Sequence, residues 1–232
     1  MNRCDTRRAF ITAALCAGLG ASALAQTAPS ASELARYQGL HAAAATGDVA
    51  RLRQAIQSGA ALNARDGHGR TALHVAAFAR QREALRVLAG AGADLNLLEN
   101  DRYDAVTIAS VADDETTLAV LLSLGASARQ TTSRYDGTAL IAAAHLGHDG
   151  VVRQLIAAGA PLDHVNNLHW TAAIEAVVLG DGGPRHQATL QALVHAGANL
   201  ALADRQGQTP LQLARSRGFT AMVKLLEAAG AR

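Results

Sequence analysis

Short apolar stretches with helical spacing recur along the chain about every 33 residues. Each stretch is followed by a Gly-Ala pair, and the six pairs begin at Gly59, Gly92, Gly125, Gly159, Gly197 and Gly230. Apolar residues three or four positions apart share one face of a helix. Glycine directly after a helix readily adopts the left-handed backbone that ends it. The pattern therefore predicts one helix before each Gly-Ala pair.

A second, alanine-rich stretch lies upstream of each of these helices. Residues 71–77 read TALHVAA and residues 138–144 read TALIAAA, both with few large side chains. Small side chains allow two helices to pack closely. A two-helix unit repeated at this period predicts a stacked repeat array. We place its units at about 34–65, 66–98, 99–131, 132–165, 166–203 and 204–232.

The details of the unit resemble the ankyrin repeat family. Residues 66–74 read DGHGRTALH, residues 92–96 read GADLN, and residues 204–211 read DRQGQTPL. Gly-Asp, Gly-His and Gly-Phe links between the helices begin at Gly47, Gly147 and Gly218. The resemblance covers about residues 34–232. It implies an all-α fold, an ankyrin-repeat solenoid of about six helix-turn-helix repeats joined by β-hairpin-like turns.

Two units depart from the family pattern. In the third, Asp104 stands where Thr is usual, and residues 113–115, DDE, replace the Gly-His link. We expect these acids near the start of the following helix, where the helix dipole favours negative charge. The fifth unit carries about five extra residues, 180–184, which we expect to form a solvent-exposed loop away from the hairpins.

Residues 1–25 have the layout of a secretory signal peptide. A charged start, residues 1–8, precedes an uncharged apolar run, residues 9–24, and the segment ends in Ala23-Leu24-Ala25. This pattern predicts cleavage after Ala25. The apolar run is shorter than the roughly 20 residues that a membrane-spanning helix needs. We therefore expect no stable membrane anchor, and a mature domain of residues 26–232.

The charged start also indicates an export route. Arg7, Arg8 and Phe10 resemble the twin-arginine motif, although Thr12 stands where that motif often has Lys. The general secretory route therefore stays open. Both routes predict a periplasmic protein.

Charge and cysteine content change once the signal is set aside. The chain has 21 basic and 19 acidic residues, and three of the basic ones and one acidic one precede residue 9. The remainder is formally neutral, which gives no electrostatic basis for nucleic-acid binding. Both cysteines, Cys4 and Cys16, also lie in the signal. The mature domain therefore has no thiol nucleophile and no thiolate metal site.

The nine histidines are the remaining candidates for chemistry. The family resemblance assigns His41 and His74 to structural hydrogen bonds in the turns, and His148 to the link between helices. His145 and His148 are three residues apart, a spacing that could hold a metal. No Gly-x-Ser-x-Gly, Walker-type or His-Glu-x-x-His motif occurs in the chain. We therefore expect no enzyme activity, no cofactor and no metal.

In the ankyrin family, the hairpin tips and the exposed face of each first helix form a concave binding surface. Position by position, the resemblance places partner-binding residues in the turns at His68, Arg70, Asp101, Tyr103, Arg134, Tyr135, Leu168, Trp170, Arg205 and Gln208. On the helices it places them at Phe78, Val111, His145, Leu146, Val178, Leu179 and Arg217. Aromatic residues are enriched at interface hot spots, and four of these positions are aromatic. The same aromatics could instead cover the neighbouring repeat.

The sequence thus predicts a non-catalytic protein-interaction module in the periplasm. We expect it to be monomeric alone and to bind a folded partner, as an accessory factor to a companion enzyme. One alternative is a secreted effector that binds a host protein. A second is a small metal-binding or hydrolytic protein that uses the histidines.

Overall fold

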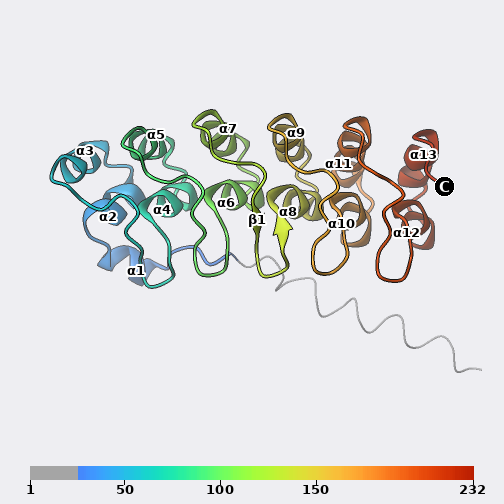
Figure 1. Ribbon diagram of the computed structural model, residues 1–232, viewed down its shortest axis with the longest axis horizontal. Helices are drawn as coiled ribbons and strands as arrows, with labels where there is room; N and C mark the ends of the chain where they lie inside the picture. Colours follow the sequence, from blue (N-terminus) through green and yellow to red (C-terminus); the bar gives the residue numbers. More distant parts are fainter. Residues whose placement is uncertain (1–25) are drawn as a thin grey trace, which may run out of the picture.

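The computed structural model describes residues 26–232, so the expected signal peptide, with Arg7, Arg8, Phe10, Ala23 and Ala25, lies outside the described residues. In the described part of the chain, helices stack in two rows along an elongated molecule, and loops project from one side (Figure 1). This arrangement confirms the all-α solenoid that the sequence predicts. Among residues 26–232, no helix is long and apolar enough to cross a membrane.

Each repeat contributes one helix to each row. The first row contains α2 (Gly39–Thr46), α4 (Ala72–Phe78), α6 (Ala105–Val111), α8 (Ala139–Leu146), α10 (Ala172–Val178) and α12 (Pro210–Ser216). The second row contains α3 (Val49–Gln57), α5 (Arg82–Gly90), α7 (Glu115–Ser123), α9 (Asp149–Ala157), α11 (Pro184–His195) and α13 (Thr220–Ala228). A short helix, α1 (Ala31–Arg36), precedes the first pair.

The glycine of each Gly-Ala pair ends the second-row helix, as predicted. All six of these glycines have φ between 79° and 95°, a left-handed conformation that strains other residues. After α3, for example, the Ala60 amide donates to the Ala55 carbonyl at 3.0 Å. This bond satisfies a carbonyl that the end of the helix would otherwise leave without a partner.

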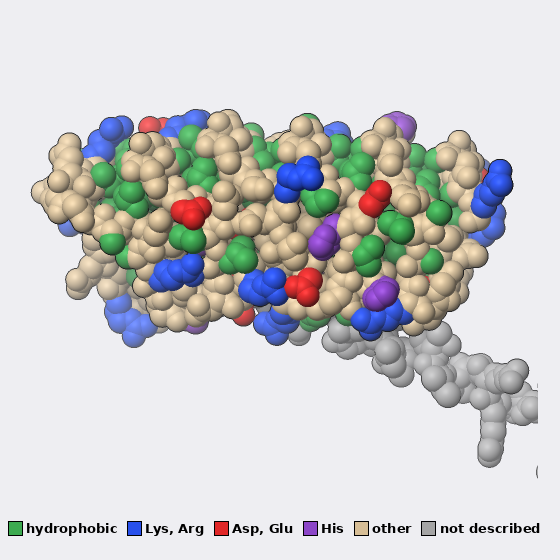
Figure 2. Space-filling model, in the orientation of Figure 1, with side chains coloured by type: hydrophobic (Ala, Val, Ile, Leu, Met, Phe, Trp, Pro, Cys, Tyr) green, Lys and Arg blue, Asp and Glu red, His purple; other side chains and the backbone are tan. Residues whose placement is uncertain are grey.

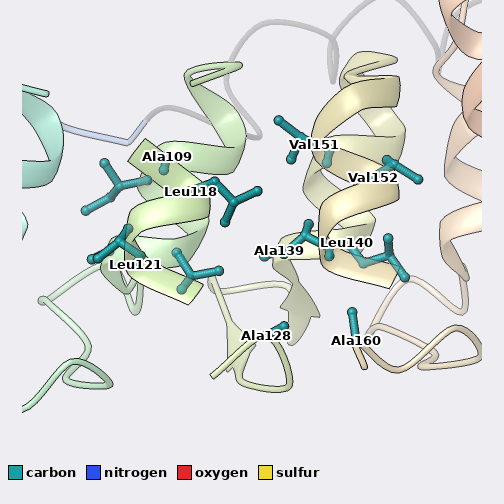
Figure 3. Close-up of a cluster of buried hydrophobic side chains, with 14 of the residues drawn as sticks. Ala109, Leu118, Leu121, Ala128, Ala139, Leu140, Val151, Val152 and Ala160 are labelled. Carbon is teal, nitrogen blue, oxygen red and sulfur yellow. The ribbon is translucent and has the colours of Figure 1, made fainter. Parts of the chain in front are cut away.

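Small side chains in the first row and leucines in the second form the core. Ala44, Ala76 and Ala143 are fully buried, as are Leu52 and Leu118. Figure 3 shows the contact between the third and fourth repeats, where alanine, leucine and valine side chains of α6 to α9 meet. The two helices of each repeat pack against each other and against the helices of the neighbouring repeats, so the core is one continuous strip along the array.

The hairpins are organised by one side chain in each turn. Asp66 Oδ1 accepts from the amides of His68 and Arg70, both at 2.9 Å. Asn166 and Asp204 do the same in their own turns. In the fourth repeat, β1 (Thr131–Thr132) pairs antiparallel with β2 (Gly137–Thr138). These turns confirm the β-hairpin-like connections that the resemblance implies.

Backbone hydrogen bonds join successive hairpins into a row. The Asn100 amide donates to the His68 carbonyl at 3.0 Å, and the Asn167 amide donates to the Tyr135 carbonyl at 2.9 Å. The spacing between hairpins is therefore fixed by the backbone as well as by the helices below.

The acids of the third repeat cap helices. Asp104 accepts from the Thr107 amide at 2.7 Å at the start of α6, and Asp114 accepts from the Thr117 amide at 3.0 Å at the start of α7. The expectation that residues 113–115 lie near a helix start is confirmed. Asp104 is almost fully buried, and this burial raises its pKa.

The extra residues of the fifth repeat are only partly exposed, so the expected solvent loop is wrong in part. Asp181 is exposed, but Gly180 is buried, and its carbonyl accepts from Arg217 at 3.1 Å. His186 also pairs with the carbonyl of His145, at 2.9 Å. The remaining extra length extends α11, which has 12 residues where the other second-row helices have 9.

Candidate binding surface

The structure divides the predicted partner-binding residues into three groups by exposure. His68, Arg134, Arg205, Gln208 and Arg217 are exposed. Ten are half-buried: Phe78, Asp101, Val111, Tyr135, His145, Leu146, Leu168, Trp170, Val178 and Leu179. Two, Arg70 and Tyr103, are buried. On the face drawn in Figure 2, charged side chains are scattered among hydrophobic ones.

Arg70 is wrongly placed on the binding surface by sequence reasoning. Its side chain is fully buried, and its Nε donates to Asp66 Oδ2 at 2.7 Å. Its other nitrogens reach Glu33 on α1 and, at 3.1 Å, the carbonyl of Thr27. Arg70 therefore ties the segment before the first repeat to the hairpin of the second repeat, and it has no surface to offer a partner.

This contact explains the pKa values of the two acids around Arg70. Hydrogen bonds from Ser30, together with the nearby guanidinium, lower the pKa of Glu33 to about 2. Hydrogen bonds from Tyr37 and from Arg70 outweigh the opposing effect of burial and lower the pKa of Asp66 to about 2. Both carboxylates are thus held in their charged forms next to the buried guanidinium.

Tyr103 is also misplaced, because only 4% of it is exposed and it packs into the core. Its amide donates to Glu99 Oε1 at 3.0 Å, as the equivalent amides of Trp170 and Gln208 donate to the first residue of their own turns. Burial raises the pKa of the Tyr103 hydroxyl. Tyr103 can act only as a wall of a pocket.

Such a pocket lies between the hairpins and the first-row helices of the third to fifth repeats. Its volume is about 50 Å³, which is room for a slender group. The lining includes six of the predicted residues: Tyr103, Tyr135, His145, Leu168, Trp170 and Leu179. The structure therefore brings together three aromatic side chains from three successive repeats.

The other predicted residues do not join this pocket. Arg134 pairs with Asp101 at 3.5 Å, Arg205 donates to the Asn167 carbonyl, and His68 pairs with Glu33 at 3.1 Å. Much of the polar surface on the hairpins is thus engaged in contacts between neighbouring repeats. The residues that also lie outside its lining are Phe78, Val111, Leu146, Val178 and Gln208.

Sequence reasoning missed Glu175, which also lines the pocket. This residue on α10 is only 4% exposed. It is the fourth residue after the N-cap Thr171, a position that holds Val75, Ile108, Ala142 and Leu213 in other repeats. A carboxylate where other repeats have apolar residues was the signal that could have revealed it.

His74 occupies a structural position, as the family resemblance implies. His74 Nδ1 accepts from the Thr71 amide at 3.1 Å, so Nε2 carries the proton and donates to the carbonyls of Leu97 and Tyr103. Burial lowers the pKa of His74 to about 4.

His145 and His148, three residues apart, face different neighbours. His145 Nδ1 lies 3.2 Å from Glu175, whereas His148 Nδ1 lies 2.9 Å from the Ser110 carbonyl. Within residues 26–232, no three His, Cys, Asp or Glu side chains are grouped to hold a metal ion.

Comparison with known proteins points to the same architecture. The family described as ankyrin repeats (3 copies) matches residues 14–99 and 105–204, so the chain belongs to the ankyrin repeat family. Ankyrin repeats are protein-interaction modules, and the family is typically non-catalytic.

Individual relatives are similar to different extents. A putative ankyrin repeat protein of Escherichia coli (strain K12) is 43% identical over 100 residues, which are 43% of this chain and half of that protein. The crystal structure of an ankyrin repeat domain from Acinetobacter baumannii AYE matches with a TM-score of 0.78 and 44% identity, over 83% of this chain and 98% of that one.

A third match shares the fold at lower identity. It is a chain from the structure of a predatory endopeptidase of Bdellovibrio bacteriovorus in complex with an immunity protein. The TM-score is 0.65 and the identity 24%, over 83% of this chain and 98% of that one.

Proposed function

We propose that this protein is an exported, non-catalytic module that binds a folded partner protein in the periplasm. The observation that carries the proposal is the pocket where Tyr103, Tyr135 and Trp170 meet between the hairpins and the first-row helices. Aromatic anchors in a partly desolvated pocket are typical of interface hot spots. The hairpins, fixed by backbone bonds, provide a rigid surface around it.

The comparisons support the binding role, and the layout of residues 1–25 supports the location. A structure with the same fold comes from a complex between an endopeptidase and an immunity protein, which is consistent with a role beside a companion enzyme. Four repeats could supply the surface of a standard interface, on the order of 1,600 Å² in total.

Affinity capture from periplasmic extract tests the binding role. The wild-type chain, Trp170→Ala and Arg86→Ala serve as baits, because Trp170 lines the pocket and Arg86 is exposed on α5 in the second row. We expect a stoichiometric partner with the wild type and with Arg86→Ala, and a depleted one with Trp170→Ala. Equal capture by all three baits would contradict the proposed surface.

Fractionation and intact mass test the location. We expect the protein in the periplasmic fraction with Gln26 as its first residue. A replacement of both Arg7 and Arg8 by Lys should block export on the twin-arginine route and should have little effect on the general secretory route. Full-length protein in the cytoplasm would contradict the proposed location.

A further inference from the structure

The pocket of the third to fifth repeats combines an apolar lining with one buried carboxylate. Its walls include Tyr103, Tyr135, Leu168 and Trp170, and Glu175 on α10 lies among them. The stacking of the repeats does not require a charged side chain here, because four other repeats have an apolar residue at the position of Glu175.

Only one of the two carboxylate oxygens of Glu175 has a hydrogen-bond partner within the described residues. Its Oε1 accepts from Asn166 Nδ2 at 3.0 Å, whereas its buried Oε2 has no hydrogen-bond partner among the described residues. His145 Nδ1 lies 3.2 Å from Oε2, but without the alignment of a hydrogen bond. A buried carboxylate oxygen without a partner is costly, so it favours a ligand that donates to it.

The surroundings select the charge of that ligand. An anion would meet the negative carboxylate, and a purely apolar group would leave Oε2 unsatisfied. A cation would gain a charge-assisted hydrogen bond from Oε2 and attraction from the aromatic rings of the pocket. The small volume, about 50 Å³, favours a slender apolar stem that ends in the charged group.

We propose that this pocket binds an ammonium or guanidinium group at the end of a Lys or Arg side chain of the partner protein. The inference rests on the proposed function, because the pocket is part of the same surface. A free amine in the periplasm has the same chemistry, and the experiment separates the two sources.

The chain contains a single tryptophan, Trp170, which lines the pocket and therefore reports on its occupant by fluorescence. The probes are Nα-acetyl-lysine amide, Nα-acetyl-arginine amide and Nα-acetyl-norleucine amide, which has the stem of lysine without its charge. We expect the two cationic probes to bind about tenfold more tightly than the norleucine probe. Equal binding of lysine and norleucine probes would overturn the proposal, and this comparison needs no variant.

Glu175→Gln keeps the shape of the side chain and removes its charge. We expect it to abolish the preference for the cationic probes and to leave the circular dichroism spectrum unchanged. Glu83→Gln, at an exposed glutamate on α5, is the matched control and should keep the preference. A Glu175→Gln protein that folds and keeps the preference would overturn the proposal.

Two further measurements identify the source of the cation: the binding of butylammonium, and the capture of the partner by Glu175→Gln. If the side chain of a partner is the occupant, Glu175→Gln weakens capture of the partner about tenfold. If butylammonium binds as tightly as the lysine probe and Glu175→Gln captures the partner normally, the assignment to a partner is overturned while the proposed function stands. If the probes bind but no partner is captured, the proposed function fails instead.

Discussion

At the scale of single residues, the polar side chains that matter most in this protein are buried. His74, Arg70 and Asp104 each complete the hydrogen bonds of a turn or of a helix start, and each has less than 2% of its surface exposed. Buried polar groups of this kind specify the hairpin geometry, because any other geometry would leave them without hydrogen-bond partners, at a cost in free energy. Their titration and replacement therefore provide direct tests of the fold.

His74 should make the fold sensitive to acid. Its pKa is about 4 in the folded protein, against 6.5 as the ordinary value, because burial disfavours the charged ring. The unfolded chain therefore binds the proton first, so this contribution to stability is complete above pH 6.5 and is lost as the pH falls towards 4. The loss amounts to about 3 kcal/mol at most.

Urea unfolding at pH 7, 5.5 and 4.5 measures this effect. In His74→Asn, the fall in the free energy of unfolding between pH 7 and 4.5 should be smaller than in the wild type. If both proteins show the same pH dependence, His74 is not the titrating group.

Arg70→Met should destabilise the protein by about 3 kcal/mol, because it leaves two carboxylates without their buried partner. It should also release α1, so that limited proteolysis cuts between residues 26 and 38. Arg36→Met, at an exposed arginine on α1, is the control and should change stability little. Unfolding free energies within 1 kcal/mol of each other for the two variants would contradict the role given to Arg70.

At the scale of elements, the alanines of the first row set the distance between repeats. Ala143 on α8 is fully buried where successive repeats pack together. Ala143→Leu should cost about 1–3 kcal/mol, because the added methyl groups cannot fit without moving a neighbouring helix. Ala221→Leu on α13, at an exposed helical alanine, is the control, and thermal unfolding compares the two. Equal melting temperatures would show that this contact is loosely packed.

The positions of most helices, and the residues at which they end, follow from the sequence. The Gly-Ala period predicts the ends of the second-row helices because only a left-handed residue can end a helix in this way, and all six glycines have that conformation. Helix α1 lies outside the period and was missed, although Ser30 and Glu33 form a capping box at its start that the sequence shows; its contact with the distant Arg70 could not be predicted. The fold of residues 180–184 similarly depends on Arg217 of the next repeat.

The candidate site was predictable only in part, for a related reason. The family pattern indicates which positions lie near the hairpins, but how deeply each side chain is buried depends on what the neighbouring segments pack against it. Tyr103 packs into the hydrophobic core, and Arg70 turns inward towards Glu33 on α1. Trp170 and Tyr135 stay half-buried at the pocket, as a binding role requires.

At the scale of the whole molecule, the array is a rigid strip with one pocket lined by aromatic side chains from three repeats. The second-row helices lie on the side of the strip opposite the hairpin loops (Figure 1). The pocket is lined by residues of the hairpins and of the first-row helices. If the proposed function holds, the binding energy is concentrated at the third to fifth repeats. Changes at the ends of the array should then affect stability more than affinity.

The affinity of the captured partner for Trp170→Ala tests the central claim most directly. Isothermal titration calorimetry should show a loss of about 2 kcal/mol or more relative to the wild type, with a circular dichroism spectrum that shows the variant still folded, whereas Arg86→Ala on the second row should bind normally. Wild-type affinity in Trp170→Ala, or an equal loss in both variants, would contradict a binding surface centred on this pocket.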